Sequence, residues 1–89
     1  MQYYIDLSTE QFQELKNHES EVVRLSKEKA IELTGTDRQP FFTESDTLKV
    51  YPPSKDPEAL RFAVTGPSRE TEDGSLEIPV EILEWMAIL

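Results

Sequence analysis

The chain has 89 residues, with 18 acidic against 9 basic residues, a net charge of −9 and no cysteine. This length allows one hydrophobic core, so residues 1–89 are expected to form a single domain. The composition excludes disulfides and cysteine-based zinc sites, and the negative charge disfavours direct binding to nucleic acid. No signal-peptide pattern and no apolar run long enough to cross a membrane is found, so a soluble, cytoplasmic protein without membrane contact is expected.

The first predicted elements are a strand over Gln2–Leu7 and a helix that begins after Ser8. Tyrosine and isoleucine favour a strand in the first segment. Ser8 followed by Gln11 three residues later is the arrangement of a capping box. Phe12 and Leu15 lie three positions apart and give this helix an inward face.

Residues 20–34 allow two interpretations. Their apolar residues share one helical arc with Phe12 and Leu15, which favours one long helix or two shorter ones ending at Gly35. The segments 22–25 and 30–33 could instead be two short strands joined by residues 26–29. Helix is the favoured interpretation.

An antiparallel hairpin is predicted from Thr47–Tyr51 and Ala59–Thr65. Both segments alternate apolar and polar residues, and the turn between them is rich in proline, serine and aspartate. The preceding residues 36–46 are irregular. Gly66–Ser75 contains two pairs of turn residues and is expected to be an exposed loop.

The last fourteen residues, 76–89, form the most apolar stretch of the chain. Three acids, Glu77, Glu81 and Glu84, fall at spacings of four and three, which predicts a helix that Pro79 opens. Its apolar side would include Trp85, expected to be buried within the monomer. Whether this segment is core or interface is left open. The predicted fold class is therefore α+β, with an N-terminal strand and capped helix, a hairpin and a short C-terminal helix.

A catalytic constellation is not found. His18 is the only histidine and lies in a polar segment, where a solvated surface residue is expected. The three glycines stand alone, so there is no phosphate-binding loop, and the acids near Asp73 do not have calcium-loop spacing. The sequence therefore predicts a protein that is not an enzyme and holds neither metal nor cofactor.

The candidate binding residues are acids and two phenylalanines. The acids have two interpretations: the solvated face of a helix and loop, or a row of carboxylates that presents charge as a nucleic-acid duplex does. An exposed phenylalanine beside such acids would anchor an interface, although both phenylalanines could instead cover the sheet edge. The predicted partner-binding residues are Glu70, Glu72, Asp73, Glu77, Glu81, Glu84, Phe41 and Phe42.

In its small size, its acidity, and its lack of cysteine and of a catalytic motif, the chain resembles phage- and plasmid-encoded inhibitors such as anti-CRISPR and anti-restriction proteins, and also bacteriocin immunity proteins. The resemblance is one of size and charge, without a shared motif. It implies an inhibitor that docks an acidic surface on a basic protein partner, such as a nucleic-acid-handling enzyme. The alternative is a structural or assembly subunit that forms a homodimer or larger oligomer through its apolar C-terminal segment.

Overall fold

The structure is a computed structural model that describes residues 1–38, 40–53 and 58–87. Its elements are β1 (Gln2–Asp6), α1 (Thr9–Lys16), β2 (Val22–Ser26), α2 (Lys27–Thr34), β3 (Thr47–Tyr51), β4 (Glu58–Val64), β5 (Arg69–Glu70) and β6 (Ser75–Ala87). The strands form one sheet in the order β1-β3-β4-β6-β2, and β5 pairs with β6. Only the β1–β3 pairing among these described strands is parallel.

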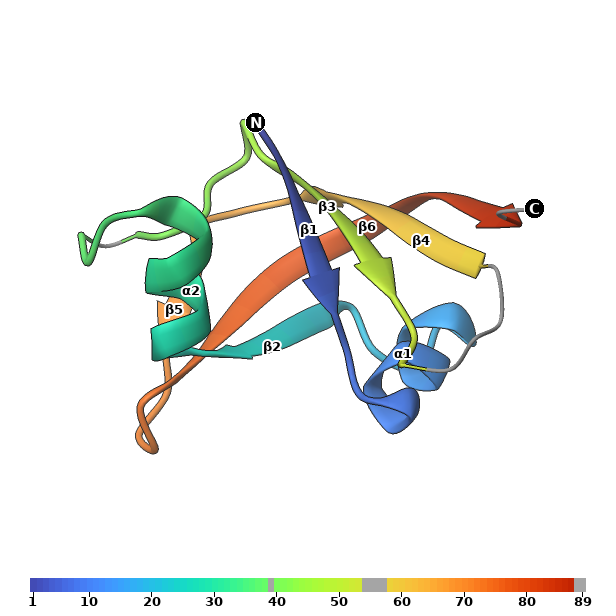
Figure 1. Ribbon diagram of the computed structural model, residues 1–89, viewed down its shortest axis with the longest axis horizontal. Helices are drawn as coiled ribbons and strands as arrows, with labels where there is room; N and C mark the ends of the chain where they lie inside the picture. The colour runs from blue at the N-terminus through green and yellow to red at the C-terminus, as the bar shows by residue number, and fades with distance from the viewer. Residues whose placement is uncertain (39, 54–57, 88–89) are drawn as a thin grey trace.

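The sheet is curled into a half-barrel, and the two short helices lie at its two ends (Figure 1). Strands account for 44% of the structure and helices for 20%, so the protein is mostly β and the predicted α+β class is wrong. The class is wrong because two segments that were expected to be helical, at β2 and at β6, are strands.

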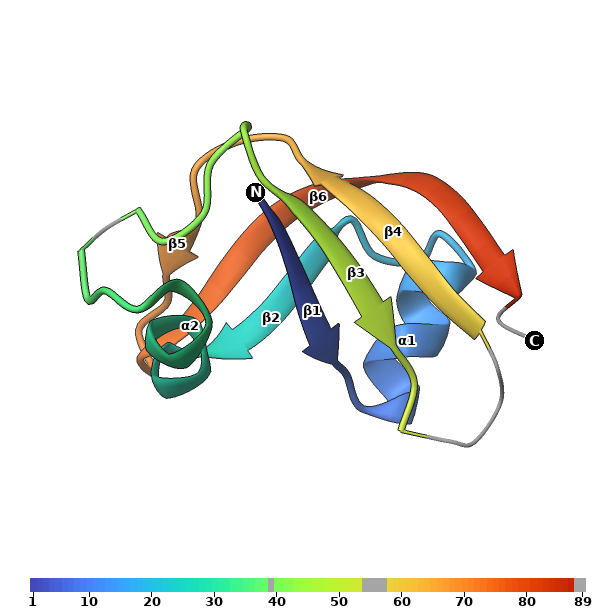
Figure 2. The same cartoon turned by 45° about the horizontal axis from the view of Figure 1, so that its top comes forward.

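The C-terminal helix prediction is wrong because the apolar residues from 76 onwards have a period of two. Leu76, Ile78 and Val80 are buried, while the residues between them are partly exposed. Pro79 pairs with Val22 of β2 on one side of β6. On the other side it lies between β5, whose pairing stops at Glu77, and β4, whose last residue Val64 pairs with Val80, so a residue without an N–H is tolerated there. Seen in Figure 2, β6 runs along the length of the sheet, first beside β2 and then beside β4.

Residues 20–34 contain one strand followed by one helix, so neither the helical prediction nor the two-strand alternative is right throughout. Val23 and Leu25 point inwards with the period of a strand. Ser26 then ends β2 and caps α2, since its side chain accepts a hydrogen bond from the Lys29 N–H at 3.1 Å. Gly35 ends α2 in the left-handed conformation, with φ +72°, which a glycine adopts without strain.

The N-terminal strand, the Ser8 cap and the hairpin are confirmed. The Ser8 side chain accepts from the Gln11 N–H at 3.2 Å, and β3 and β4 pair antiparallel. The Gln11 side chain does not complete a capping box. It accepts from the Arg24 N–H at 2.6 Å and donates to the Arg24 carbonyl at 3.4 Å, so it covers the outer edge of β2 as a neighbouring strand would.

The core lies inside the curl of the sheet. The inward side chains of the strands meet Phe12 and Leu15 from α1 and Ala30 from α2. The loop predicted over Gly66–Ser75 contains the short strand β5, and Ser68 in it is buried and bonded to the backbone of Phe42. Within the described part of the chain, no helix has the length and apolar character needed to cross a membrane.

Candidate protein-binding site

Phe41 and Phe42 are core residues. Phe41 is 5% exposed and Phe42 is fully buried, with its ring edge-on to that of Tyr3 at a centroid distance of 5.2 Å. Hydrogen bonds between the backbone of Phe42 and Ser68 hold the loop over this end of the core. Neither phenylalanine is available as the surface anchor that the sequence suggested.

The six predicted acids do not form one surface. Glu72 and Asp73 lie in the turn between β5 and β6, and a strand rises ~3.3 Å per residue, which places Asp73 on the order of 30 Å from Glu84. Asp73 has a local role: its carboxylate accepts from the Thr71 hydroxyl and the Ser75 N–H. These hydrogen bonds, the Thr71 one foremost, hold the pKa of Asp73 below its usual range.

The three acids of β6, Glu77, Glu81 and Glu84, lie on the outer face of the sheet. They share this face because of the strand geometry and a bulge, and not because of helical spacing. Glu81 lies opposite Ala63 and Glu84 opposite Arg61, two residues apart on β4. The register shift at this point makes Leu83 an extra residue, and this bulge returns Glu84 to the face of Glu81. The carboxylates therefore lie on one face along an extended strand.

Most of these carboxylates are neutralised within the molecule. Glu77 lies 3.7 Å from both Arg24 and Arg69, and Glu84 lies 3.0 Å from Arg61. Glu70 forms an ion pair with Lys27 at 3.4 Å. Glu81 differs, since no basic side chain of the described residues lies within ion-pair distance of it.

A cavity of about 300 Å³ adjoins Glu81 at the edge of β6. Among the described residues, the last hydrogen bond on this side of β6 is the one that the Val80 N–H donates to the Glu21 carbonyl at 2.8 Å. Beyond it, the segment that connects α1 to β2 diverges from β6. Val80 points inwards and Glu81 outwards, yet both line the cavity. A cavity that lies against the edge of a strand contacts side chains of both faces. The lining residues are Leu15, His18, Glu21, Phe62, Thr65, Val80, Glu81 and Ile82.

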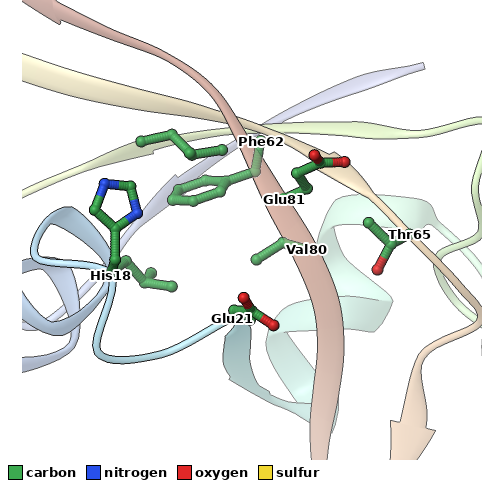
Figure 3. Close-up of a pocket in the computed structure, with 8 residues that line it drawn as sticks. His18, Glu21, Phe62, Thr65, Val80 and Glu81 are labelled. Atoms are coloured by element: carbon green, nitrogen blue, oxygen red, sulfur yellow. The ribbon is translucent and has the colours of Figure 1, made fainter.

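His18 forms one wall of this cavity, across from Thr65, with Phe62 and Val80 between them in the view of Figure 3. It is exposed, and it ends α1 with φ +60°, the left-handed conformation. The His18 and Glu19 N–H groups donate to the carbonyls of Leu15 and Glu14, the pattern that terminates many helices at a glycine. A histidine at this position is strained by about 1 kcal/mol. The polar sequence around His18 predicted that it is exposed, but it did not predict that His18 lines a cavity.

Beyond the cavity, Leu83 and Trp85 are exposed apolar residues, 48% and 52% accessible. Trp85 is oriented despite its exposure. Its indole N–H donates to a Glu58 carboxylate oxygen at 3.1 Å, and the same oxygen accepts from Lys16 at 2.8 Å. The Lys16 ammonium also lies 5.7 Å from the centre of the indole ring. The prediction that Trp85 is buried in the monomer is wrong.

The Trp85 contacts have an electrostatic consequence for Glu58. Hydrogen bonds from Lys16 and then from Trp85 hold the pKa of Glu58 below its usual range, so the carboxylate is charged at neutral pH. An indole held in one orientation loses less conformational entropy when a partner contacts it. In the apolar C-terminal segment, the side chain of Met86 and residues Ile88 and Leu89 lie outside the described parts.

The candidate site therefore combines a strand edge, a small cavity, two exposed apolar side chains and the carboxylates Glu21 and Glu81. The sequence did not indicate Glu21, His18 and Leu83 as site residues, since the residues after Pro79 were expected to form a helix and not the edge of a sheet. The alternation of Leu76, Ile78, Val80 and Ile82 was the signal that would have indicated a strand. No group of three or more His, Cys, Asp or Glu residues that could hold a metal is found in the described residues.

Comparison with known proteins adds no family to this description. No family model matches the chain, and no curated protein matches it significantly. The function is therefore inferred from the geometry of the site.

Proposed function

We propose that this protein is a non-enzymatic binding module, an acidic inhibitor or adaptor that docks on a basic surface of a partner protein. The observation that carries the proposal is the C-terminal half of β6, where exposed Leu83 and Trp85 lie near Glu81, which has no basic side chain within ion-pair distance among the described residues. Interfaces combine apolar anchors with complementary charge, and tryptophan is enriched among the residues that dominate binding energy. The proposal includes a cytoplasmic location for the protein.

The contact charges in this proposal differ from those the sequence suggested. Glu70, Glu77 and Glu84 are engaged in ion pairs within the chain, whereas Glu21 and Glu81 are exposed and have no basic side chain within ion-pair distance in the described residues. Together with the net charge of −9, they favour fast, salt-sensitive association with a basic protein. A nucleic-acid-handling enzyme has such a surface, which makes inhibition by charge mimicry the most direct use of the site.

The test is capture from a candidate host lysate at low and high salt, with bound proteins identified by mass spectrometry. The variant E21K/E81K reverses two charges at the cavity, and D37K/E44K reverses two exposed charges on the loop before β3 as a matched control. We expect a basic partner that is lost at high salt and with E21K/E81K but retained with D37K/E44K. Equal retention by both variants would refute the proposed charged contact.

The alternative function, assembly through the C-terminal segment, is favoured by one of the same observations. Exposed apolar residues on a strand edge can pair with a second copy of the chain. Sedimentation velocity over a range of concentrations tests it: a dimer that W85A/L83A converts to a folded monomer would support assembly. A monomer at all concentrations would leave the basic partner as the function.

A further inference from the structure

We propose that the partner is bound by strand addition: an extended segment with alternating basic and aliphatic residues pairs with the free edge of β6 beside the cavity. This inference rests on the proposed function and specifies its binding mode. Strand addition supplies affinity through main-chain hydrogen bonds and specificity through pockets for alternate side chains.

The backbone of β6 is available for this pairing from Ile82 onwards. The Val80 N–H donates to Glu21 on the side of β2, and residues two apart in a strand direct their backbone groups to the same side. The N–H and C=O of Ile82 therefore point to the edge that β2 has left. β2 pairs with residues 75–79 of β6 only. On this side of β6, no strand of the described residues pairs with 81–87.

The other sheet edges in the described part of the chain lack this combination. The outer edge of β2 is covered at Arg24 by the side chain of Gln11, which forms hydrogen bonds with both the backbone N–H and the backbone C=O of Arg24. Among the described strands β1 pairs with β3 alone, but no residue of β1 lines either of the two cavities described beside the sheet. Natural proteins protect sheet edges that are not used for pairing, so an open edge next to an apolar hollow indicates a docking position.

The cavity is suited to a side chain rather than to a free ligand. Its volume of about 300 Å³ is at the lower limit for small-molecule sites. Leu15, Phe62 and Val80 give it an apolar floor. A strand added to β6 would direct every second side chain towards this floor, and a valine, a leucine or the stem of a lysine would fill it.

The charge at the edge selects a basic segment over a second copy. Glu21 and Glu81 line the cavity without a basic side chain within ion-pair distance in the described residues. A second β6 would bring its own Glu81 and Glu84 to the same edge, and like charges across paired strands are destabilising. Lysine or arginine at alternate positions of a partner strand would instead form charge-assisted hydrogen bonds with these carboxylates.

The test is an NMR titration of the full chain with synthetic peptides. The probe is a short peptide of alternating lysine and valine. One control peptide has the same sequence with N-methyl groups on alternate backbone nitrogens, which keeps the charge and removes donors for a ladder. The second control replaces lysine with glutamate.

We expect the lysine–valine peptide to slow exchange of the Ile82 amide hydrogen and to shift the resonances of 80–85. N-methylation and the E21K/E81K change should each weaken binding by about tenfold or more, the effect of losing charge-assisted or ladder hydrogen bonds. D37K/E44K should bind as the unchanged protein does, and the glutamate peptide should not bind.

Three results would overturn strand addition, and they separate it from the proposed function. Equal binding of the N-methylated peptide, with the Ile82 amide unprotected, would leave a basic partner but exclude a ladder. Protection of Ile82 that grows with protein concentration in the absence of peptide would show that a second copy occupies the edge. Binding of neither basic peptide would exclude both strand addition at this edge and attraction of basic segments to it.

Discussion

The two halves of β6 are the most instructive comparison in this protein. From Ser75 to Pro79 the strand pairs with β2 on one side, and at Leu76 and Glu77 it also pairs with β5 on the other. Its inward side chains here are fully buried. From Glu81 onwards it has β4 as its only neighbour in the described structure, and Leu83 and Trp85 are about half exposed. One continuous strand thus serves as the centre of the core at one end and as an open edge at the other.

The difference arises from the chain around β6 rather than from β6 itself. Both halves are rich in apolar residues and both carry glutamate. The first half is enclosed because β2 reaches it, and the second is open because the chain turns away at His18 and Glu21. Apolar character therefore stabilises the fold in one half and is available for binding in the other.

The largest expected effect comes from truncating one apolar side chain in each half. Ile78→Ala should lower the free energy of unfolding by about 2–4 kcal/mol, because Ile78 is fully buried and the substitution leaves a cavity. Leu83→Ala should cost less than about 0.5 kcal/mol, as is usual for a surface site. Urea denaturation followed by circular dichroism measures both. Similar losses would mean that the second half is as well packed as the first.

Removing the cover from the edge of β2 is the next test. Gln11→Ala should destabilise the protein by about 1 kcal/mol, since it removes both side-chain hydrogen bonds to the backbone of Arg24. Gln13→Ala, an exposed position on the same helix, is the matched control and should have little effect. Thermal unfolding of both variants measures the difference, and equal stability would show that Gln11 does not support the covered half.

The third test concerns the contacts that orient Trp85. Glu58→Gln should cost about 0.5–1 kcal/mol at neutral pH, the range of an exposed or partly exposed ion pair. Because the pKa of Glu58 is lowered in the folded state, its charged form contributes stability above the unfolded-state value of about 4.3. That contribution is lost as pH falls through the lower folded-state pKa, and the variant should then be as stable as the unchanged protein.

Denaturation across this pH range, read by fluorescence of the single tryptophan, measures the Glu58 effect. Glu44→Gln, at an exposed position in the loop before β3, is the control and should unfold as the unchanged protein does. A stability difference for Glu58→Gln that persists in acid would contradict the electrostatic origin.

The smallest expected effect is a gain. His18→Gly should stabilise the protein by about 0.5 kcal/mol, because glycine adopts the left-handed conformation with φ +60° without strain. Gly35→Ala, where φ is +72° and no atom crowds the added methyl group, should lose about 1 kcal/mol by the reverse argument. Differential scanning calorimetry measures both. A loss of stability in His18→Gly would show that the imidazole makes contacts that outweigh the strain.

Local signals in the sequence predicted the elements whose contacts are near in the chain. Ser8 indicated the start of α1, Gly35 indicated the end of α2, and alternation predicted the hairpin of β3 and β4. The candidate site was predicted in part. Glu81 was among the expected contact residues, whereas Phe41 and Phe42 are in the core and most of the other acids are paired or support a turn.

The sequence by itself determined the acidity, the helix caps and the hairpin of this protein, because these depend on composition and on neighbours within a few residues. Only the tertiary structure decided that residues 75–87 form one strand, since the spacing of Glu77, Glu81 and Glu84 fits one stripe of a helix while Leu76, Ile78 and Val80 alternate as on a strand. Pairing with β2 and β4, from distant parts of the chain, resolves that ambiguity. The same pairings decide which carboxylates meet an arginine and which remain available at the free edge of β6.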